Sequence, residues 1–166
     1  QVNMALSVAD LVEFGGISML EAGTGVGKSF AYLIPALLSG QAVVISTATI
    51  TLQDQLVSRD IPAVERLLGS SFSVAVLKGR SNYLCLRKAD LAGVPPGGLE
   101  PGAPPAKLAG DAMDCLRSRC PRMTDCHYYR ARNRARNASI LVVNHHLLLC
   151  GLENGDIIPE AWLLVV

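Results

Sequence analysis

The stretch Glu21-Ala22-Gly23-Thr24-Gly25-Val26-Gly27-Lys28-Ser29 decides the fold class of this chain. It has the P-loop pattern, with Ala22 in place of the first glycine, and it lies between the apolar run 17–20 and the helical pattern 29–38. Glycines let successive backbone N–H groups turn inward around phosphate oxygens, and the positive end of the following helix adds to the attraction. This context favours a nucleotide site over the alternative, a glycine-rich turn that binds nothing.

The last two residues of the motif carry the chemistry expected of it. Lys28 is expected to reach the β- and γ-phosphates of a nucleoside triphosphate, and the Ser29 hydroxyl is expected to bind Mg²⁺. Both are therefore candidate catalytic residues. The predicted ATP-binding residues in this stretch are Ala22, Gly23, Thr24, Gly25, Val26, Gly27, Lys28 and Ser29.

Short apolar runs alternate with helical patterns along most of the chain. Strands are expected over 17–20, 42–45, 72–77, 140–143 and 163–166. Helices are expected over 1–14, 29–38 and 50–59, ending at Gly15-Gly16, Ser39-Gly40 and Asp60-Ile61-Pro62. Strand and helix at this rhythm predict an α/β fold with a parallel sheet and helices on both faces.

An insertion interrupts this rhythm after the third predicted strand. Within it, Gly93–Pro105 has nine Gly or Pro residues out of thirteen and is expected to be a loop. We therefore divide the chain into 1–78, the first part of a P-loop domain, 79–138, the insertion, and 139–166, a return to the domain.

Composition excludes two broad classes of protein. No apolar stretch approaches the roughly 18 to 20 residues of a membrane span. The N-terminus has no basic region followed by an apolar run, so a secretory signal is not expected. We therefore expect a cytoplasmic location. The absence of an initiator Met predicts a start inside a longer protein.

The cysteines of the insertion are a candidate metal site. Five cysteines are an odd number for a disulfide framework, and clustered cysteines in a reducing compartment more often bind metal. Cys85, Cys115, Cys120 and Cys126 suit a [4Fe–4S] cluster. Structural zinc and four free core thiols remain as alternatives, although zinc usually takes cysteines in closer pairs. Cys150 follows an apolar run and is expected to be packed.

Positive charge is concentrated between Cys115 and Arg136, which contains seven arginines and one aspartate, a net charge of +6. The chain as a whole carries only +1. A helix with arginines on most sides suits phosphate contacts with nucleic acid, while an ordinary solvated face is the alternative. The candidate DNA contacts are Arg130, Arg132, Arg134 and Arg136. Tyr128 and Tyr129 are placed either to stack on bases or to pack against the cysteine loop.

Taken together, these motifs resemble those of superfamily 2 helicases of the XPD and DinG type. Among the subfamilies of this family, the chain most resembles the bacterial YoaA group. The resemblance covers nearly the whole chain. Besides the P-loop and the cysteine spacing, it is carried by Gln1-x-x-Met4, Val44–Thr49 with Leu52–Leu56, Lys78–Cys85 and Val142–Leu147. The segment between Cys85 and Cys115 is short for this family.

The resemblance implies a RecA-like motor domain with an iron–sulfur insertion in an ATP-dependent 5′–3′ DNA helicase. It implies ATP, Mg²⁺ and a [4Fe–4S] cluster as cofactors, single-stranded or forked DNA as substrate, and replication or repair proteins as partners, without a membrane. It adds Gln1 as the residue that reads adenine. Thr47 and Thr49 are implied as donors to DNA phosphates, with capping of the following helix as the alternative.

The family continues its Leu-Leu-Val-Val strand into Asp-Glu-Ala-His, and this chain stops at Val166. The 166 residues are therefore expected to bind nucleotide without hydrolysing it. The rival prediction is a P-loop NTPase that is not a helicase and carries a structural zinc site. His145 and His146 are neighbours in sequence and point apart on a helix, so a packing or coupling role is favoured over catalysis.

Overall fold

The computed structural model describes residues 1–166 except 24, 26, 96–102, 155–157 and 159–162. Within the described residues a four-stranded sheet has the order β2-β3-β1-β4, and every pair of neighbours is parallel. The strands are β1 (Val43–Thr47), β2 (Val74–Val76), β3 (Ile140–Asn144) and β4 (Leu163–Val165). The predicted α/β fold with a parallel sheet is confirmed.

The two central strands are aligned from end to end. Val43 of β1 lies opposite Ile140 of β3, and Thr47 lies opposite Asn144. All of β1 is buried, and β3 is buried up to Val143, as expected for parallel strands covered on both faces. The carboxyl ends of β1 and β3 therefore lie level, at the edge where open parallel sheets bind ligands.

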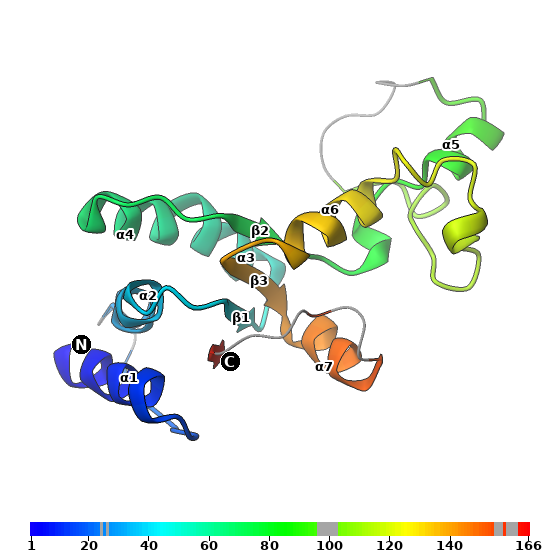
Figure 1. Cartoon of the computed structure of the whole chain (residues 1–166). Coiled ribbons are helices and arrows are strands. Elements are labelled where there is room, and N and C mark those ends of the chain that lie inside the picture. The colour runs from blue at the N-terminus through cyan, green and yellow to red at the C-terminus, as the bar shows by residue number, and fades with distance from the viewer. Residues whose placement is uncertain (24, 26, 96–102, 155–157, 159–162) are drawn as a thin grey trace.

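Helices cover both faces of the sheet, as Figure 1 shows. One core cluster joins alternate strand residues such as Val43 and Ile45 to α2 (Lys28–Leu38), the π-helical turn η1 (Leu56–Asp60) and α4 (Ile61–Leu68). The other joins Val44, Leu141 and Val143 to α6 (His127–Arg136) and α7 (His145–Asn154). The period-two alternation of the strands thus divides their apolar side chains between two helical layers.

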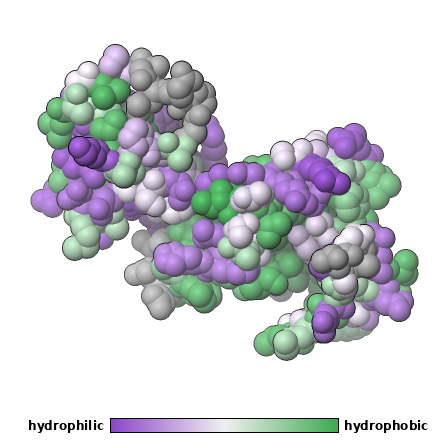
Figure 2. All heavy atoms as spheres, turned by 180° about the vertical axis from the view of Figure 1, so that it is seen from behind, coloured by the Kyte–Doolittle hydropathy of each residue, from purple (hydrophilic) through white to green (hydrophobic). Residues whose placement is uncertain are grey.

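The first helix, α1 (Val2–Phe14), begins after Gln1, ends at Gly15 as predicted, and packs against α2. The strand expected over 17–20 is wrong, because these residues form no regular element, and Ile17 and Met19 are 97% and 96% exposed. A strand needs backbone partners, and the described sheet ends on β4 instead of pairing with this run. Apolar side chains reach the surface at the lower right of Figure 2, on the side where α1 lies.

The helix expected to end at Asp60-Ile61-Pro62 continues past it. The helical segment runs from α3 (Ile50–Gln55) through η1 into α4. It ends only at Gly69, whose φ is +63°. Pro62 lies in the first turn of α4, where a missing N–H costs little, and the wider turn of η1 precedes it. The predicted end was wrong because proline at this position starts a helical turn and does not terminate one.

Most of the insertion between β2 and β3 forms a lobe beside the sheet (Figure 1), and its last helix, α6, packs against the sheet. The insertion contains η2 (Arg80–Asn82), α5 (Leu86–Leu91), η3 (Arg117–Arg119) and α6. Backbone hydrogen bonds from Cys85 to Leu108 and from Gly110 to Tyr83, both 2.8 Å, tie its two halves together. The described ends of the predicted loop 93–105 are irregular, while 96–102 lie outside the described residues. No helix within the described part of the chain is long and apolar enough to span a membrane.

Candidate nucleotide site and cysteine-rich insertion

The P-loop is held in shape by two glycines and one lysine. Gly25 and Gly27 have φ values of +77° and +76°, a backbone conformation that glycine adopts without a steric penalty. Gly27 precedes α2, and the Lys28 Nζ donates hydrogen bonds to the carbonyl oxygens of Ala22 and Gly23, each 2.7 Å long. The loop thus wraps a cation at the N-terminus of a helix. The predicted contacts of Thr24 and Val26 lie outside the described residues.

Gln1 lies beside the P-loop although it is 26 residues away in sequence. Its Nε2 donates a hydrogen bond of 3.4 Å to the Gly27 carbonyl oxygen. The family resemblance implies that Gln1 binds the adenine base, and the structure places its side chain at the edge of the P-loop. Its contact with the base itself remains a prediction.

Replacing Gly27 with alanine is expected to destabilise the fold by about 1–2 kcal/mol, because a side chain is strained in the left-handed conformation. The added Cβ lies 2.6 Å from the Gln1 Nε2, which would displace that side chain. Thermal unfolding without nucleotide measures the effect. Gly23→Ala is the matched control, since its Cβ meets nothing within 4 Å. Equal losses of stability in the two variants would contradict a special role for the Gly27 backbone.

A cavity of about 350 Å³ opens beside the P-loop at the carboxyl edge of the sheet. Residues far apart in sequence line it, and the polar ones are Lys28, Ser29, Tyr32, Ser46, Thr47, Gln55, Asp60 and His145. Ser46 Oγ and His145 Nδ1 are 2.7 Å apart, so the end of β1 and the start of α7 are hydrogen-bonded within the lining. The structure therefore gathers Lys28, Ser29 and a histidine around one space.

Tyr32 and Asp60 belong to this lining and were not singled out from the sequence. Burial raises the pKa of Tyr32, a hydrogen bond with Ser29 lowers it, and the charge of Asp60 raises it, with a net upward shift. Tyr32 is therefore a neutral phenol beside the candidate magnesium ligand. Its spacing of three residues from Ser29 on one helix could have indicated this contact. No local signal indicates Asp60, because its place depends on how η1 packs against α2.

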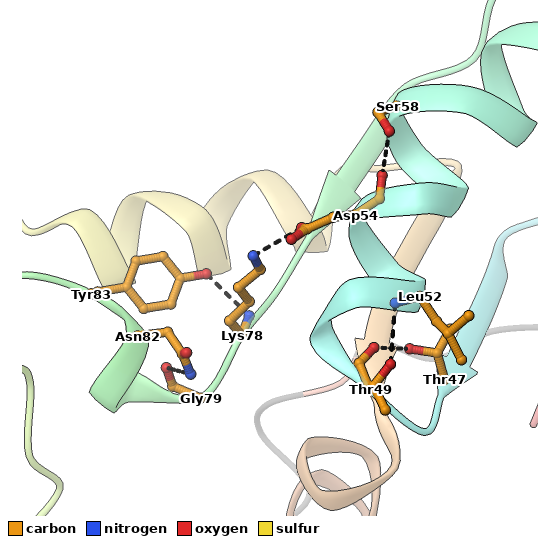
Figure 3. A network of polar contacts seen from close by, with 9 residues as sticks. All are labelled: Thr47, Thr49, Leu52, Asp54, Ser58, Lys78, Gly79, Asn82 and Tyr83. Carbon is orange, nitrogen blue, oxygen red and sulfur yellow. Dashed lines mark hydrogen bonds and ion pairs between the residues drawn. The ribbon is translucent and has the colours of Figure 1, made fainter. Parts of the chain in front are cut away.

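The two predicted DNA-binding threonines are engaged within the loop between β1 and α3 (Figure 3). Thr49 is the N-cap of α3, and its Oγ1 accepts a hydrogen bond from Leu52 N at 3.2 Å. Thr47, which is buried, donates from its Oγ1 to the Thr49 carbonyl oxygen at 2.9 Å. Helix capping by Thr49 is confirmed. Contact of either hydroxyl with DNA remains a prediction.

A second part of the network in Figure 3 joins α3 to the start of the insertion. Lys78 Nζ forms an ion pair of 2.9 Å with Asp54 of α3, and Lys78 N donates to the Tyr83 hydroxyl at 3.1 Å. Asn82 Nδ2 donates to the Gly79 carbonyl oxygen at 3.1 Å. The segment that enters the insertion is therefore anchored to the helix that follows β1.

Three of the four candidate metal ligands line a single small pocket, namely Cys85, Cys115 and Cys126. Cys85 and Cys126 directly precede α5 and α6, and Cys120 directly follows η3. Within the described residues none of the five cysteines forms a disulfide, and all five are half-buried. Within the described residues, no three Cys, His, Asp or Glu side chains are arranged to hold a metal ion. The structure thus places three of the predicted ligands around one pocket and does not assemble the predicted four-cysteine site.

Arg80 lines the same pocket. Its Nη1 donates to Cys115 Sγ at 2.8 Å, and its guanidinium lies 4.1 Å from the ring centroid of Tyr128. Burial lowers the pKa of Arg80, but hydrogen bonding to Tyr129 and the charge of Cys115 raise it, and the net shift is upward. The Arg80 guanidinium is therefore hydrogen-bonded to the sulfur of one candidate ligand and stacked on an aromatic ring.

The tyrosines of α6 pack within the molecule. Tyr128 is buried and meets Tyr83 and Tyr129 edge to face, with ring centroids 5.7 and 5.4 Å apart. Packing is confirmed for Tyr128, so stacking of this ring on bases was the wrong alternative. The same inner face of α6 carries Ala135 against the sheet. Arg130, Arg134 and Arg136 are exposed, while Arg132 is half-buried.

Comparison with known proteins identifies relatives along the whole chain. The ATP-dependent DNA helicase YoaA of Escherichia coli (strain K12) is 36% identical over 99% of this chain, and that of Haemophilus influenzae is 35% identical over 99%. The ATP-dependent helicase DinG of Mycobacterium tuberculosis is 34% identical over 100%. The chain spans 31%, 31% and 33% of these proteins, about one third of their length. No protein-family model matches the chain.

Proposed function

We propose that this chain, which is similar over 99% of its length to the ATP-dependent DNA helicase YoaA of Escherichia coli, is the nucleotide-binding part of an ATP-dependent DNA helicase of the DinG/XPD type. The observation that carries the proposal is the P-loop itself, with Lys28 at the start of α2 beside the carboxyl edge of a parallel sheet. In this proposal the domain is a RecA-like motor whose ATP cycle drives 5′–3′ movement on DNA, in repair or replication.

In this proposal the P-loop, Gln1 and Tyr32 each have a part in holding Mg²⁺ and ATP. The backbone of Gly23–Gly27 cradles the phosphates, and Lys28 neutralises their charge. The Ser29 hydroxyl binds Mg²⁺, and Gln1, at the edge of the loop, contacts the adenine. Tyr32 keeps the Ser29 side chain in place through the hydrogen bond between them.

For the 166-residue polypeptide itself we propose binding without hydrolysis. Hydrolysis needs carboxylates that hold the metal and orient water, and a cation that stabilises the transition state. The sequence contains no Asp-Glu-Ala-His segment. The carboxylate that lines the cavity is Asp60, which lies beside Tyr32.

In the insertion, Cys85, Cys115, Cys120 and Cys126 are proposed to hold a [4Fe–4S] cluster. Three of these cysteines line one pocket, which supports the proposal, and a [4Fe–4S] cluster takes four cysteine ligands. Cys120 lies between Cys115 and Cys126 in sequence and is the fourth donor. When bound, the cluster supplies a rigid structural centre for the insertion.

The exposed arginines of α6 are proposed to contact DNA phosphates, together with Arg132 on the flank of the helix and with Thr47 and Thr49. We expect that changing Arg130, Arg134 and Arg136 to Gln weakens single-strand binding. The slope of log K against log salt should fall by about 2, at roughly 0.7 per phosphate contact. Fluorescence anisotropy of a labelled oligonucleotide at several salt concentrations measures both quantities.

The matched control for this triple variant is Arg59→Gln with Arg66→Gln, because both arginines are exposed and lie on η1 and α4, outside the insertion. The control should keep the salt slope of the wild type. If the α6 variant also kept it, the arginines would form only a solvated face. Preference among DNA sequences should stay the same in either variant, since phosphate contacts carry no base information.

A further inference from the structure

His145 lies in the lining of the nucleotide cavity although no motif of the P-loop class requires it. Its Nδ1 is 2.7 Å from the Oγ of Ser46, a residue only 4% exposed at the end of β1. Asn144 closes β3, and its side chain accepts from Leu147 N at 2.8 Å, which sets the start of α7. The imidazole is therefore hydrogen-bonded to strand β1, and Asn144 caps the helix on which His145 lies.

The bond to Ser46 leaves the other ring nitrogen for a further partner. When Nδ1 accepts the Ser46 proton, Nε2 carries the ring hydrogen and acts as a donor. Lys28 and Ser29, the residues expected at the phosphates, line the same cavity. Thr47 and Asn144 lie opposite one another at the ends of β1 and β3, so His145 lies where the nucleotide cavity meets these strand ends.

We propose that His145, anchored by Ser46, is a nucleotide-binding residue that contacts the terminal phosphate of ATP and so distinguishes ATP from ADP. This inference rests on the proposed nucleotide site. It assigns that site a residue from the far side of the sheet, supplied 117 positions after Lys28. Through Ser46, the contact would couple the presence of the terminal phosphate to the end of β1, next to Thr47.

The test compares the affinity of a non-hydrolysable ATP analogue with that of ADP, both with Mg²⁺. In His145→Ala the analogue should bind about tenfold more weakly, the size of a hydrogen bond to a charged group. ADP should bind within about twofold of the wild type. His146→Ala is the matched control, since His146 is the next residue on the same helix and is exposed. It should leave both affinities unchanged.

Two further variants separate the phosphate contact from the anchor. His145→Asn keeps an amide near the Nδ1 position for Ser46 and lacks the far ring nitrogen, so it should fold normally and lose the preference for the ATP analogue. Ser46→Ala should lose part of that preference, because the ring is no longer oriented. Thermal unfolding confirms that each variant is folded.

Equal weakening of ADP and the ATP analogue in both His145 variants, or no weakening of either, would overturn the assignment. The proposed nucleotide site fails in a different way. If the wild type bound neither nucleotide, or bound both no better than Lys28→Ala, the site itself would be wrong and the role of His145 would fall with it.

Discussion

Replacing Lys28 with alanine is expected to weaken the binding of Mg²⁺–ADP and of a non-hydrolysable ATP analogue by at least about 100-fold. The Lys28 ammonium lies within the loop, bonded to the carbonyl oxygens of Ala22 and Gly23. Two hydrogen bonds to phosphate oxygens from a charged donor account for a loss of this size, at about 1.5 kcal/mol or more each. Isothermal titration calorimetry measures the affinities.

The control for this variant is Lys78→Ala. This variant also removes one positive charge. Lys78, however, forms an ion pair with Asp54 in the network that leads into the insertion, and it does not belong to the P-loop. This variant should bind both nucleotides like the wild type. A Lys28→Ala protein with undiminished affinity would show that the glycine-rich loop is only a turn, which was the alternative for this motif.

The same preparation tests whether the 166-residue chain hydrolyses ATP. Turnover should stay at background with or without single-stranded DNA, since loss of an arginine finger alone costs about 10³- to 10⁵-fold. Turnover that depends on Lys28 and is stimulated by DNA would mean that a catalytic carboxylate lies within the chain. Asp60, which lines the cavity, would then be the first residue to replace.

Changing any one of Cys85, Cys115, Cys120 and Cys126 to serine is expected to abolish bound iron in protein purified without oxygen. The wild type should be brown and contain about four iron and four sulfide per chain, because a cubane cluster needs four thiolates. Iron and sulfide analysis with the visible absorption spectrum measures the loss. Cys150→Ser should keep the full complement, since Cys150 lies on α7 and outside the insertion.

The metal analysis also decides between the two candidate cofactors. Stoichiometric zinc without iron in anaerobic preparations would favour the zinc-site alternative. A wild type that binds neither metal would leave the four thiols as ordinary half-buried side chains. The hydrogen bond from Arg80 to Cys115 would then be a packing contact within the insertion.

The parts of the fold that follow from near neighbours in sequence were predicted correctly. The helix predicted over 29–38 is observed as α2, one residue longer at its start, and the glycine-rich loop before it has positive φ at Gly25 and Gly27. The parallel sheet follows from short apolar runs separated by helices. Each of these depends on backbone sterics or on periodicity within a few residues, which one sequence contains in full.

Predictions that depend on which residues meet in the folded chain were less accurate than those that depend on local sequence. An apolar run becomes a strand only where another strand offers its hydrogen-bonding edge, and Ile17–Leu20 has none within the described sheet. Tyr128 has an aromatic ring of the kind that stacks on bases, yet this ring packs against Tyr83 and Arg80. Which side of α6 turns inward depends on its packing against the sheet.

The sequence by itself determined the P-loop, the type of fold and the identity of the four candidate cysteines. Only the tertiary structure brought Gln1 to Gly27, three of the cysteines to one pocket, and His145 to Ser46 across 99 positions of chain. The physical reason is that such contacts depend on the register between β1 and β3 and on the path of the insertion. Register is set by the packing of the whole sheet, so no local pattern of residues encodes it.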